Sequence, residues 1–118
     1  MKKILLIDRD QKFIGDLQTK FALSHEILAT DNLKTAFKLM EKKNFDLLVA
    51  RIPQSSNLPD HEKLIKMLKK LNSKKYVDIK KILLAPENAN FQIHEYTHLG
   101  IAAIVFDMKN FHNMIVKI

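Results

Sequence analysis

The stretch Phe45-Asp46-Leu47-Leu48-Val49-Ala50-Arg51 decides the fold of this chain. Four consecutive apolar residues, 47 to 50, predict a strand that is buried on both faces, and such strands occupy the middle of parallel sheets. The residue at the carboxyl end of a central parallel strand faces the crevice where open α/β sheets bind ligands. That residue is Arg51, so the sequence predicts a guanidinium at this edge of the sheet.

A guanidinium that is partly withdrawn from water needs carboxylate partners. Two other predicted strands end in acids: Asp8 and Asp10 follow the apolar residues 4–7, and Asp107 follows residues 101–106. Because the carboxyl ends of parallel strands lie at the same edge of a sheet, we expect these three carboxylates to converge on Arg51.

Composition limits the classes of protein to consider. The chain of 118 residues is expected to form one domain, residues 1–118, and its 47% apolar content argues against disorder. It has no cysteine, which excludes disulfides and thiolate metal sites. No apolar run approaches the ~20 residues of a membrane span, and no signal peptide precedes the first strand, so we expect a cytoplasmic protein with no membrane partner. The net charge of +7 comes mostly from lysines, which suits solubility or weak attraction to anions better than phosphate recognition.

Strand and helix patterns alternate along the whole chain. Strands are expected at residues 3–7, 26–30, 45–51, 81–85 and 101–106. Helices are expected to begin after Asp10, Asp31 and Asp60 and to occupy residues 90–99 and 110–118, and the prolines of the loop at 52–59 oppose regular structure. This alternation predicts an α/β fold, a doubly wound parallel sheet of five strands in the order 2-1-3-4-5 with helices on both faces.

Four segments carry a family resemblance. Residues 4–10 match an apolar strand with an acidic cluster, residues 29–36 match an entry into a second helix, residues 45–51 match a strand that ends in a phosphorylated aspartate, and residues 99–102 match an approach to a last strand. On these segments the whole chain resembles the receiver domain of bacterial two-component response regulators. The resemblance implies a flavodoxin-like, CheY-like fold and a role in phosphorelay signal transduction.

The resemblance also shows where this chain departs from the family. Receivers of this type use an aspartate nucleophile, a divalent metal held by an acidic pair, a Ser or Thr and a lysine. The matching residues here form a degenerate phosphorylation pocket, in which the nucleophile's position is Arg51, the hydroxyl's is Ala85, the lysine's is Asp107, and Asp8, Arg9 and Asp10 surround the metal's position. Arginine has no lone pair for phosphorus and opposes a neighbouring cation, so we expect no catalytic residue, no cofactor and loss of Mg²⁺ binding.

Arg51 and Asp107 keep the charges of the family's nucleophile and lysine with their signs reversed. We predict that Arg51 occupies the space of the metal and phosphate and bridges Asp8 or Asp10 to Asp107 as a permanent ionic plug. The open alternative is a decayed pocket in which Arg51 points into solvent. With Ala85 and with Ile104 at the position of the family's switching aromatic, the resemblance implies that the phosphorylation switch is also missing.

These departures predict a non-enzymatic, phosphorylation-independent module that binds a protein partner or forms a homodimer. The resemblance implies a partner face, since receivers commonly use the helix at 90–99, the strand at 101–106 and the last helix for this purpose. On it we expect Leu99, Phe111 and Ile115 in the core and Tyr96, His112 and Met114 as exposed contacts. One alternative is the N-terminal regulatory domain of a longer response regulator, with a DNA-binding or enzymatic output domain beyond Ile118. Another is phosphorylation at Asp8 or Asp10.

Two further patterns are interpreted as non-catalytic. The string His94-Glu95-Tyr96-Thr97-His98 has the spacing of zinc proteases, but the chain lacks a peptide cleft and a convincing third ligand, so a solvated helix is favoured. The dense lysines between residues 63 and 81 lack interleaved arginines and aromatics, so a solvated face is favoured over nucleic-acid binding.

Overall fold

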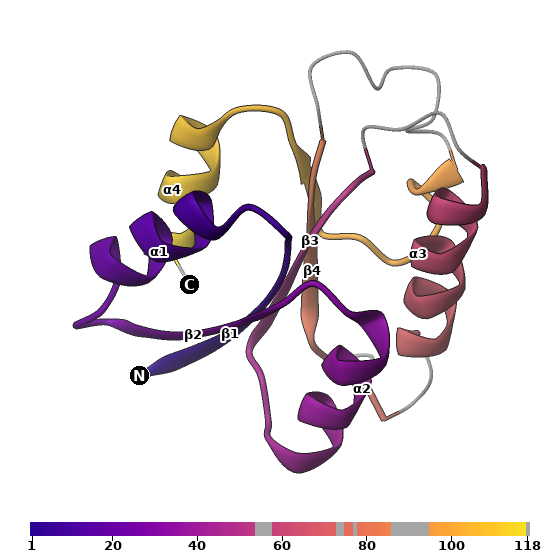
Figure 1. Cartoon of the computed structure of the whole chain (residues 1–118), viewed down its shortest axis with the longest axis horizontal. Coiled ribbons are helices and arrows are strands. Elements are labelled where there is room, and N and C mark those ends of the chain that lie inside the picture. The colour runs from indigo at the N-terminus through magenta and orange to yellow at the C-terminus, as the bar shows by residue number, and fades with distance from the viewer. Residues whose placement is uncertain (54–57, 73–74, 77, 86–94, 118) are drawn as a thin grey trace.

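The computed structural model describes residues 1–53, 58–72, 75–76, 78–85 and 95–117 (Figure 1). The elements follow one another as β1 (Lys2–Ile7), α1 (Gln11–Lys20), β2 (His25–Thr30), α2 (Leu33–Lys42), β3 (Leu47–Arg51), α3 (Leu58–Leu71), β4 (Lys80–Leu84), β5 (Ala103–Val105) and α4 (Met108–Val116). In the part of the chain that is described, no helix is both long enough and apolar enough to cross a membrane.

The five strands form one parallel sheet in the order β2-β1-β3-β4-β5, as the sequence predicts. The central strand β3 pairs with β1 on one side and with β4 on the other, and residues 47 to 50 are fully buried. The apolar run at residues 47 to 50 therefore forms the central strand of the sheet, where both of its faces are covered.

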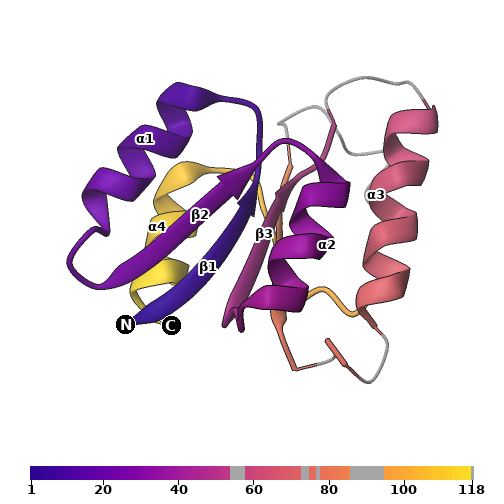
Figure 2. The ribbon, with the colours of Figure 1, turned by 60° about the horizontal axis from the view of Figure 1, so that its bottom comes forward.

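Helices cover both faces of the sheet (Figure 2). Side chains of α2 and α3 pack with Leu5, Leu48 and Leu83 in one core cluster. Side chains of α1 and α4 pack with Leu6, Val49 and Leu84 in the other. Successive residues of a strand point to opposite faces, so each central strand contributes to both clusters. The result is the predicted doubly wound architecture.

Two of the three predicted helix caps are wrong. Asp10 does cap α1, because its side chain accepts a hydrogen bond from the Phe13 N–H. The cap of α2 is Asn32 instead of Asp31; its Oδ1 atom accepts from the N–H groups of residues 34 and 35. Helix α3 begins at Leu58, before Asp60, since a proline in the first turn of a helix loses no intrahelical hydrogen bond.

The end of the chain also differs from the prediction. Strand β5 has only three residues, and α4 begins at Met108 because Asp107 is its N-cap. Most of the predicted helix at 90–99 lies outside the described residues; the described part, residues 95–99, follows turns instead of an α-helix. Gly100 has φ +70°, and a Cβ atom there would lie 2.6 Å from the Asn72 Oδ1 atom, so glycine is required where this segment meets the end of α3.

Candidate functional site

The predicted pocket residues lie where the strands end. Asp8 follows β1, and its backbone N–H donates to the Thr30 carbonyl of β2. Arg51 is the last residue of β3, and the N–H of the next residue, Ile52, donates to Leu84 of β4. Ala85 follows β4, is buried, and donates its N–H to Val105 of β5. The parallel sheet thus brings residues from distant parts of the sequence to one edge.

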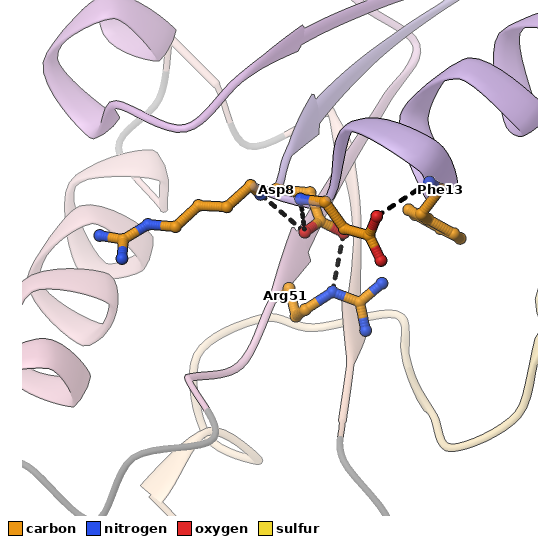
Figure 3. Close-up of polar contacts among 5 residues, drawn as sticks. Asp8, Phe13 and Arg51 are labelled. Atoms are coloured by element: carbon orange, nitrogen blue, oxygen red, sulfur yellow. Dashed lines mark hydrogen bonds and ion pairs between the residues drawn. The ribbon is translucent and has the colours of Figure 1, made fainter.

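An ion pair between Asp8 and Arg51 is the central contact of this edge (Figure 3). The Arg51 Nε atom donates to the Asp8 Oδ2 atom over 2.7 Å. The Asp8 side chain is 2% exposed and the Arg51 side chain 30%, so the carboxylate is buried under the guanidinium. The predicted contact between Arg51 and an acid of the β1 end is therefore present, and the solvent-facing alternative is wrong.

The other oxygen of Asp8 is also satisfied. Asp8 Oδ1 accepts hydrogen bonds from the backbone N–H groups of Arg9 over 2.7 Å and of Asp10 over 3.1 Å. A buried carboxylate with a cation on one oxygen and two N–H groups on the other has its charge fully compensated. The loop between β1 and α1 is held in place by the same contacts.

Arg51 also contacts an aromatic ring. Its guanidinium carbon lies 4.9 Å from the centroid of Phe13, on the first turns of α1. A guanidinium over a ring face gains ~0.5–1 kcal/mol at exposed sites. Asp10, the alternative to Asp8 as the partner of Arg51, instead caps this helix by accepting from the backbone N–H of Phe13. Arg51 therefore links the ends of β1 and β3 to α1.

The predicted bridge to Asp107 is wrong. Asp107 is exposed, and its two oxygens accept from the backbone N–H and the side-chain amide of Asn110 over 2.9 and 2.8 Å. Among the described residues, Asp8 is the one acid that forms an ion pair with Arg51. Asp107 is the N-cap residue of α4, and its carboxylate accepts from the backbone N–H three residues later, as an N-cap aspartate does. The ionic plug therefore joins two strand ends, not three.

A pocket of about 960 Å³ lies beside the ion pair. Its lining includes Asp8, Arg9 and Asp10 after β1, and Arg51 to Pro53 after β3. It continues toward the starts of α2 and α3, where Lys34 and Lys63 contribute cations and the partly exposed Leu33 lies above the buried Leu64. Arg9, predicted next to the metal position, is exposed on the wall of this pocket.

The residues predicted as exposed partner contacts lie elsewhere. Tyr96 is fully buried, and its hydroxyl lies 2.7 Å from Nδ1 of the buried His61 on α3, so its assignment as a surface residue is wrong. Burial and the neighbouring Glu95 raise the pKa of Tyr96, which keeps the phenol neutral. This buried pair joins α3 to the segment before Gly100. The sequence signal for it was weak, since a lone histidine and a lone tyrosine 35 residues apart show no shared pattern.

His112 and Met114 are half-buried on α4. The His112 ring packs edge-on against Phe21, and its Nδ1 atom lies 2.8 Å from Lys20 Nζ. Burial and the Lys20 cation lower the pKa of His112. His112 therefore faces α1 and does not belong to the predicted partner face, whereas Met114 packs against the cluster beneath α1 and α4. Leu99, Phe111 and Ile115 are core residues, as predicted.

The zinc-protease string is only partly visible, because His94 lies outside the described residues. Within the described part of the chain, no three His, Asp or Glu side chains gather where they could hold a metal ion. Among the described lysines of the predicted basic stretch, Lys81 is not solvated: it is 2% exposed and donates to the carbonyls of Tyr76 and Ile79 over 3.4 and 3.0 Å. Burial lowers the pKa of Lys81.

Comparison with solved structures adds the fold's name. The chemotaxis response regulator CheY4 of Vibrio cholerae superposes with a TM-score of 0.76 at 14% identity, covering 99% of this chain and 98% of that one. The receiver domain of the TMAO respiratory system response regulator TorR gives 0.79 at 13% identity, covering 99% and 92%. The fold is that of a response-regulator receiver. The response regulator protein TrrA of Thermotoga maritima, in complex with Mg²⁺ and BeF, gives a TM-score of 0.70 at 21% identity, covering 99% of this chain and 96% of that one.

No protein-family model matches the sequence, and no curated protein is similar enough to be called a relative. The receiver fold is therefore recognised here through backbone geometry, while the side chains at the strand ends have to be interpreted by their own chemistry.

Proposed function

We propose that this chain is a phosphorylation-independent receiver-like module that acts by binding a protein partner in the cytoplasm and has no enzymatic activity of its own. One observation carries the proposal: Nε of Arg51 lies 2.7 Å from Oδ2 of Asp8, which among the described residues is the buried acid at the edge where a receiver would place its phosphoacceptor and metal. A phosphoryl group or a magnesium ion would have to displace a charge that is covalently part of the chain.

The geometry of Asp8 supports the absence of metal. A magnesium ion needs carboxylate oxygens that are free to coordinate it at about 2.0–2.1 Å. Both oxygens of Asp8 already accept hydrogen bonds, and a guanidinium covers one of them. The described residues of this edge therefore do not fit a divalent cation, and the proposed function uses none.

The same geometry argues against phosphorylation at Asp8 or Asp10. A carboxylate attacks phosphorus with an oxygen lone pair that is open to the incoming group. Asp8 is buried and fully hydrogen-bonded, and Asp10 uses one oxygen to cap α1. The regulatory domain of a longer response regulator remains a compatible form of the proposal, because an interaction module works equally well as part of a longer chain.

Intact-mass spectrometry after incubation with acetyl phosphate and Mg²⁺ tests the proposal. The wild-type chain is expected to gain no phosphoryl group, while a phosphorylatable receiver in the same tube serves as the positive control. A mass increase that hydroxylamine removes would identify an acyl phosphate and contradict the proposal.

A magnesium titration followed by backbone amide NMR sharpens the result. The amides of Asp8, Arg9 and Asp10 are expected to stay unshifted in the wild-type chain. In the variant R51A, where the carboxylate loses its cation, these signals are expected to move at millimolar Mg²⁺. The variant R9A is the matched control, because it removes an exposed arginine that no described contact ties to Asp8 Oδ2.

A further inference from the structure

Helices α2 and α3 carry most of the helical charge of the molecule. Together they hold seven lysines and three acids, whereas α1 and α4 on the other face of the sheet hold three lysines and one acid. All seven side chains are exposed: Lys34, Lys38, Lys42, Lys63, Lys66, Lys69 and Lys70. A row of like charges has no role in packing and raises the potential of the surface that bears it.

The two helices lie side by side on one face of the sheet (Figures 1 and 2). Lys70 Nζ of α3 lies 5.8 Å from the ring centroid of Phe37 of α2, so the two helices meet there. Residues three, four or seven positions apart share one side of a helix, which places Lys63 and Lys66 on the same side of α3 as Lys70. The same rule places Lys34 on the Phe37 side of α2. Lysines of both helices therefore border the line where the helices meet.

We name this region the α2–α3 seam: Lys34, Phe37 and Lys38 of α2, and Lys63, Lys66 and Lys70 of α3. Lys34 and Lys63 also line the pocket of about 960 Å³ at the carboxyl edge of the sheet. The pocket lining adds the partly exposed Leu33 to one end of the cationic strip, above the buried Ile52 and Leu64.

We propose that the α2–α3 seam docks an acidic amphipathic segment of a partner protein. Carboxylates spaced one helical turn apart would meet the lysines of the two helices, and an apolar side chain of the same segment would enter the pocket. Helix-in-groove recognition uses this combination of a charged border and an apolar anchor. The attraction of unlike charges speeds association, and the apolar anchor supplies the residence time.

The chemistry of the seam favours a peptide over a nucleic acid. The aromatic ring of the seam, Phe37, already has the Lys70 ammonium 5.8 Å from its centroid, and this cation would compete with a stacking base. Two guanidiniums line the pocket, and Arg51 is already paired with Asp8, which leaves Arg9 as the exposed one. Asp10 and Asp31 line the pocket too, and a nucleic-acid strand has a phosphate at every nucleotide, whereas a peptide can place a neutral side chain over these acids.

Fluorescence anisotropy with a defined probe tests the seam. The probe is a labelled synthetic helix with glutamates at i, i+4 spacing on one side and leucines beside them. The double variant K34E/K63E is expected to weaken its binding at least ~10-fold, since it replaces two attractive charge pairs with repulsive ones. The matched control K12E/K109E changes the same charge on α1 and α4, and it is expected to change binding less than ~2-fold.

Three further measurements make every outcome informative. The neutral variant K34Q/K63Q is expected to weaken binding as well. It keeps the test decisive if K34E/K63E fails to fold. A probe with serines in place of the leucines is expected to bind more weakly, whereas equal binding would show simple charge attraction and overturn the proposal. Three other results would each overturn the proposal. The seam and control variants could lose equal affinity, or the probe could fail to bind. Duplex DNA or phosphatidylserine vesicles could also bind the seam more tightly than the probe does.

The inference rests on the proposed function, because it assigns the partner surface of an interaction module. The two can fail separately. Phosphorylation of the chain would contradict the proposed function and leave the binding data unchanged. Failure of the probe to bind the seam would leave the ion pair of Arg51 and Asp8 and the unphosphorylated state unaffected.

Discussion

Two ionisable side chains are buried at opposite edges of the sheet, and the molecule compensates them differently. Asp8, at the carboxyl edge, has a guanidinium on one oxygen and two backbone N–H groups on the other. Lys81, at the amino edge, has only two backbone carbonyls as described hydrogen-bond partners. Burial lowers the pKa of Lys81, which means that its charge is less stable in the fold than in water. The charge at the carboxyl edge is therefore paired with an opposite charge, whereas the charge at the amino edge has only neutral hydrogen-bond partners among the described residues.

The variant R51A breaks the first half of this comparison and should have the largest effect. Removing the guanidinium leaves the Asp8 carboxylate buried without its cation, so we expect a loss of ~2–3 kcal/mol in the free energy of unfolding. Urea denaturation measures it. The exposed control R9A is expected to cost less than ~0.5 kcal/mol. If the double variant D8N/R51M were no more stable than R51A, the loss would come from packing on Phe13, not from the unpaired charge.

The variant Y96F tests a buried hydrogen bond in place of a buried ion pair. The Tyr96 hydroxyl and His61 are both buried, so removing the hydroxyl should cost ~1–2 kcal/mol, less than an unpaired carboxylate. Thermal unfolding followed by circular dichroism is suitable. An unchanged midpoint would show that His61 satisfies itself through other contacts, and the exposed change T97S provides the reference for this segment.

Lys81 gives a smaller effect, which depends on pH. Because its folded pKa is lowered from 10.5, the unfolded chain binds the proton more tightly, and stability should rise as the pH rises from the folded pKa toward 10.5. The variant K81M keeps the apolar stem and should flatten this rise. The adjacent exposed lysine provides the control K80M, which should retain the slope. Equal slopes in all three proteins would show that general charge repulsion, not Lys81, causes the rise.

His112 should show the smallest effect, since it is only half-buried. Its pKa is lowered by burial and by the Lys20 cation, so the fold favours the neutral ring and should lose stability as the pH falls through 6.5. The His112 ring protons, followed by NMR, are expected to titrate below 6.5. The variant K20M should move this titration upward, and an unmoved midpoint would leave burial as the whole cause.

The comparison of the two edges also shows what the sequence could predict. The apolar runs fixed the strands, and their order brought Arg51 to the acids after β1, so the Asp8 contact could be inferred from chain topology. Asp107 misled the prediction because an acid after a strand is equally suited to cap the following helix, and Asn110 three residues later was the overlooked signal. Whether two side chains meet depends on the other hydrogen bonds open to each of them, and a pattern of apolar strands carries no information about these.

The amino edge was harder to predict. Lys81 stands in a run of lysines and looked like part of a solvated face, although its alternation with Leu83 places both side chains on the same side of β4. Tyr96 was assigned to the surface from a helical pattern, while the structure has turns at residues 95–99 and a partner for its hydroxyl on α3. Both errors concern polar groups whose burial depends on a tertiary contact outside the local sequence.

The Asp8–Arg51 pair has a consequence for how such a protein would be controlled. A bound ion or an acyl phosphate exchanges with the surroundings, so chelators, phosphatases and dilution all act on it. A guanidinium tethered by the backbone has no dissociation step and is present at the same effective concentration in every molecule. If the chain is the phosphorylation-independent module proposed above, the remaining variable is the number of its copies relative to the partner, and synthesis and turnover would set the response.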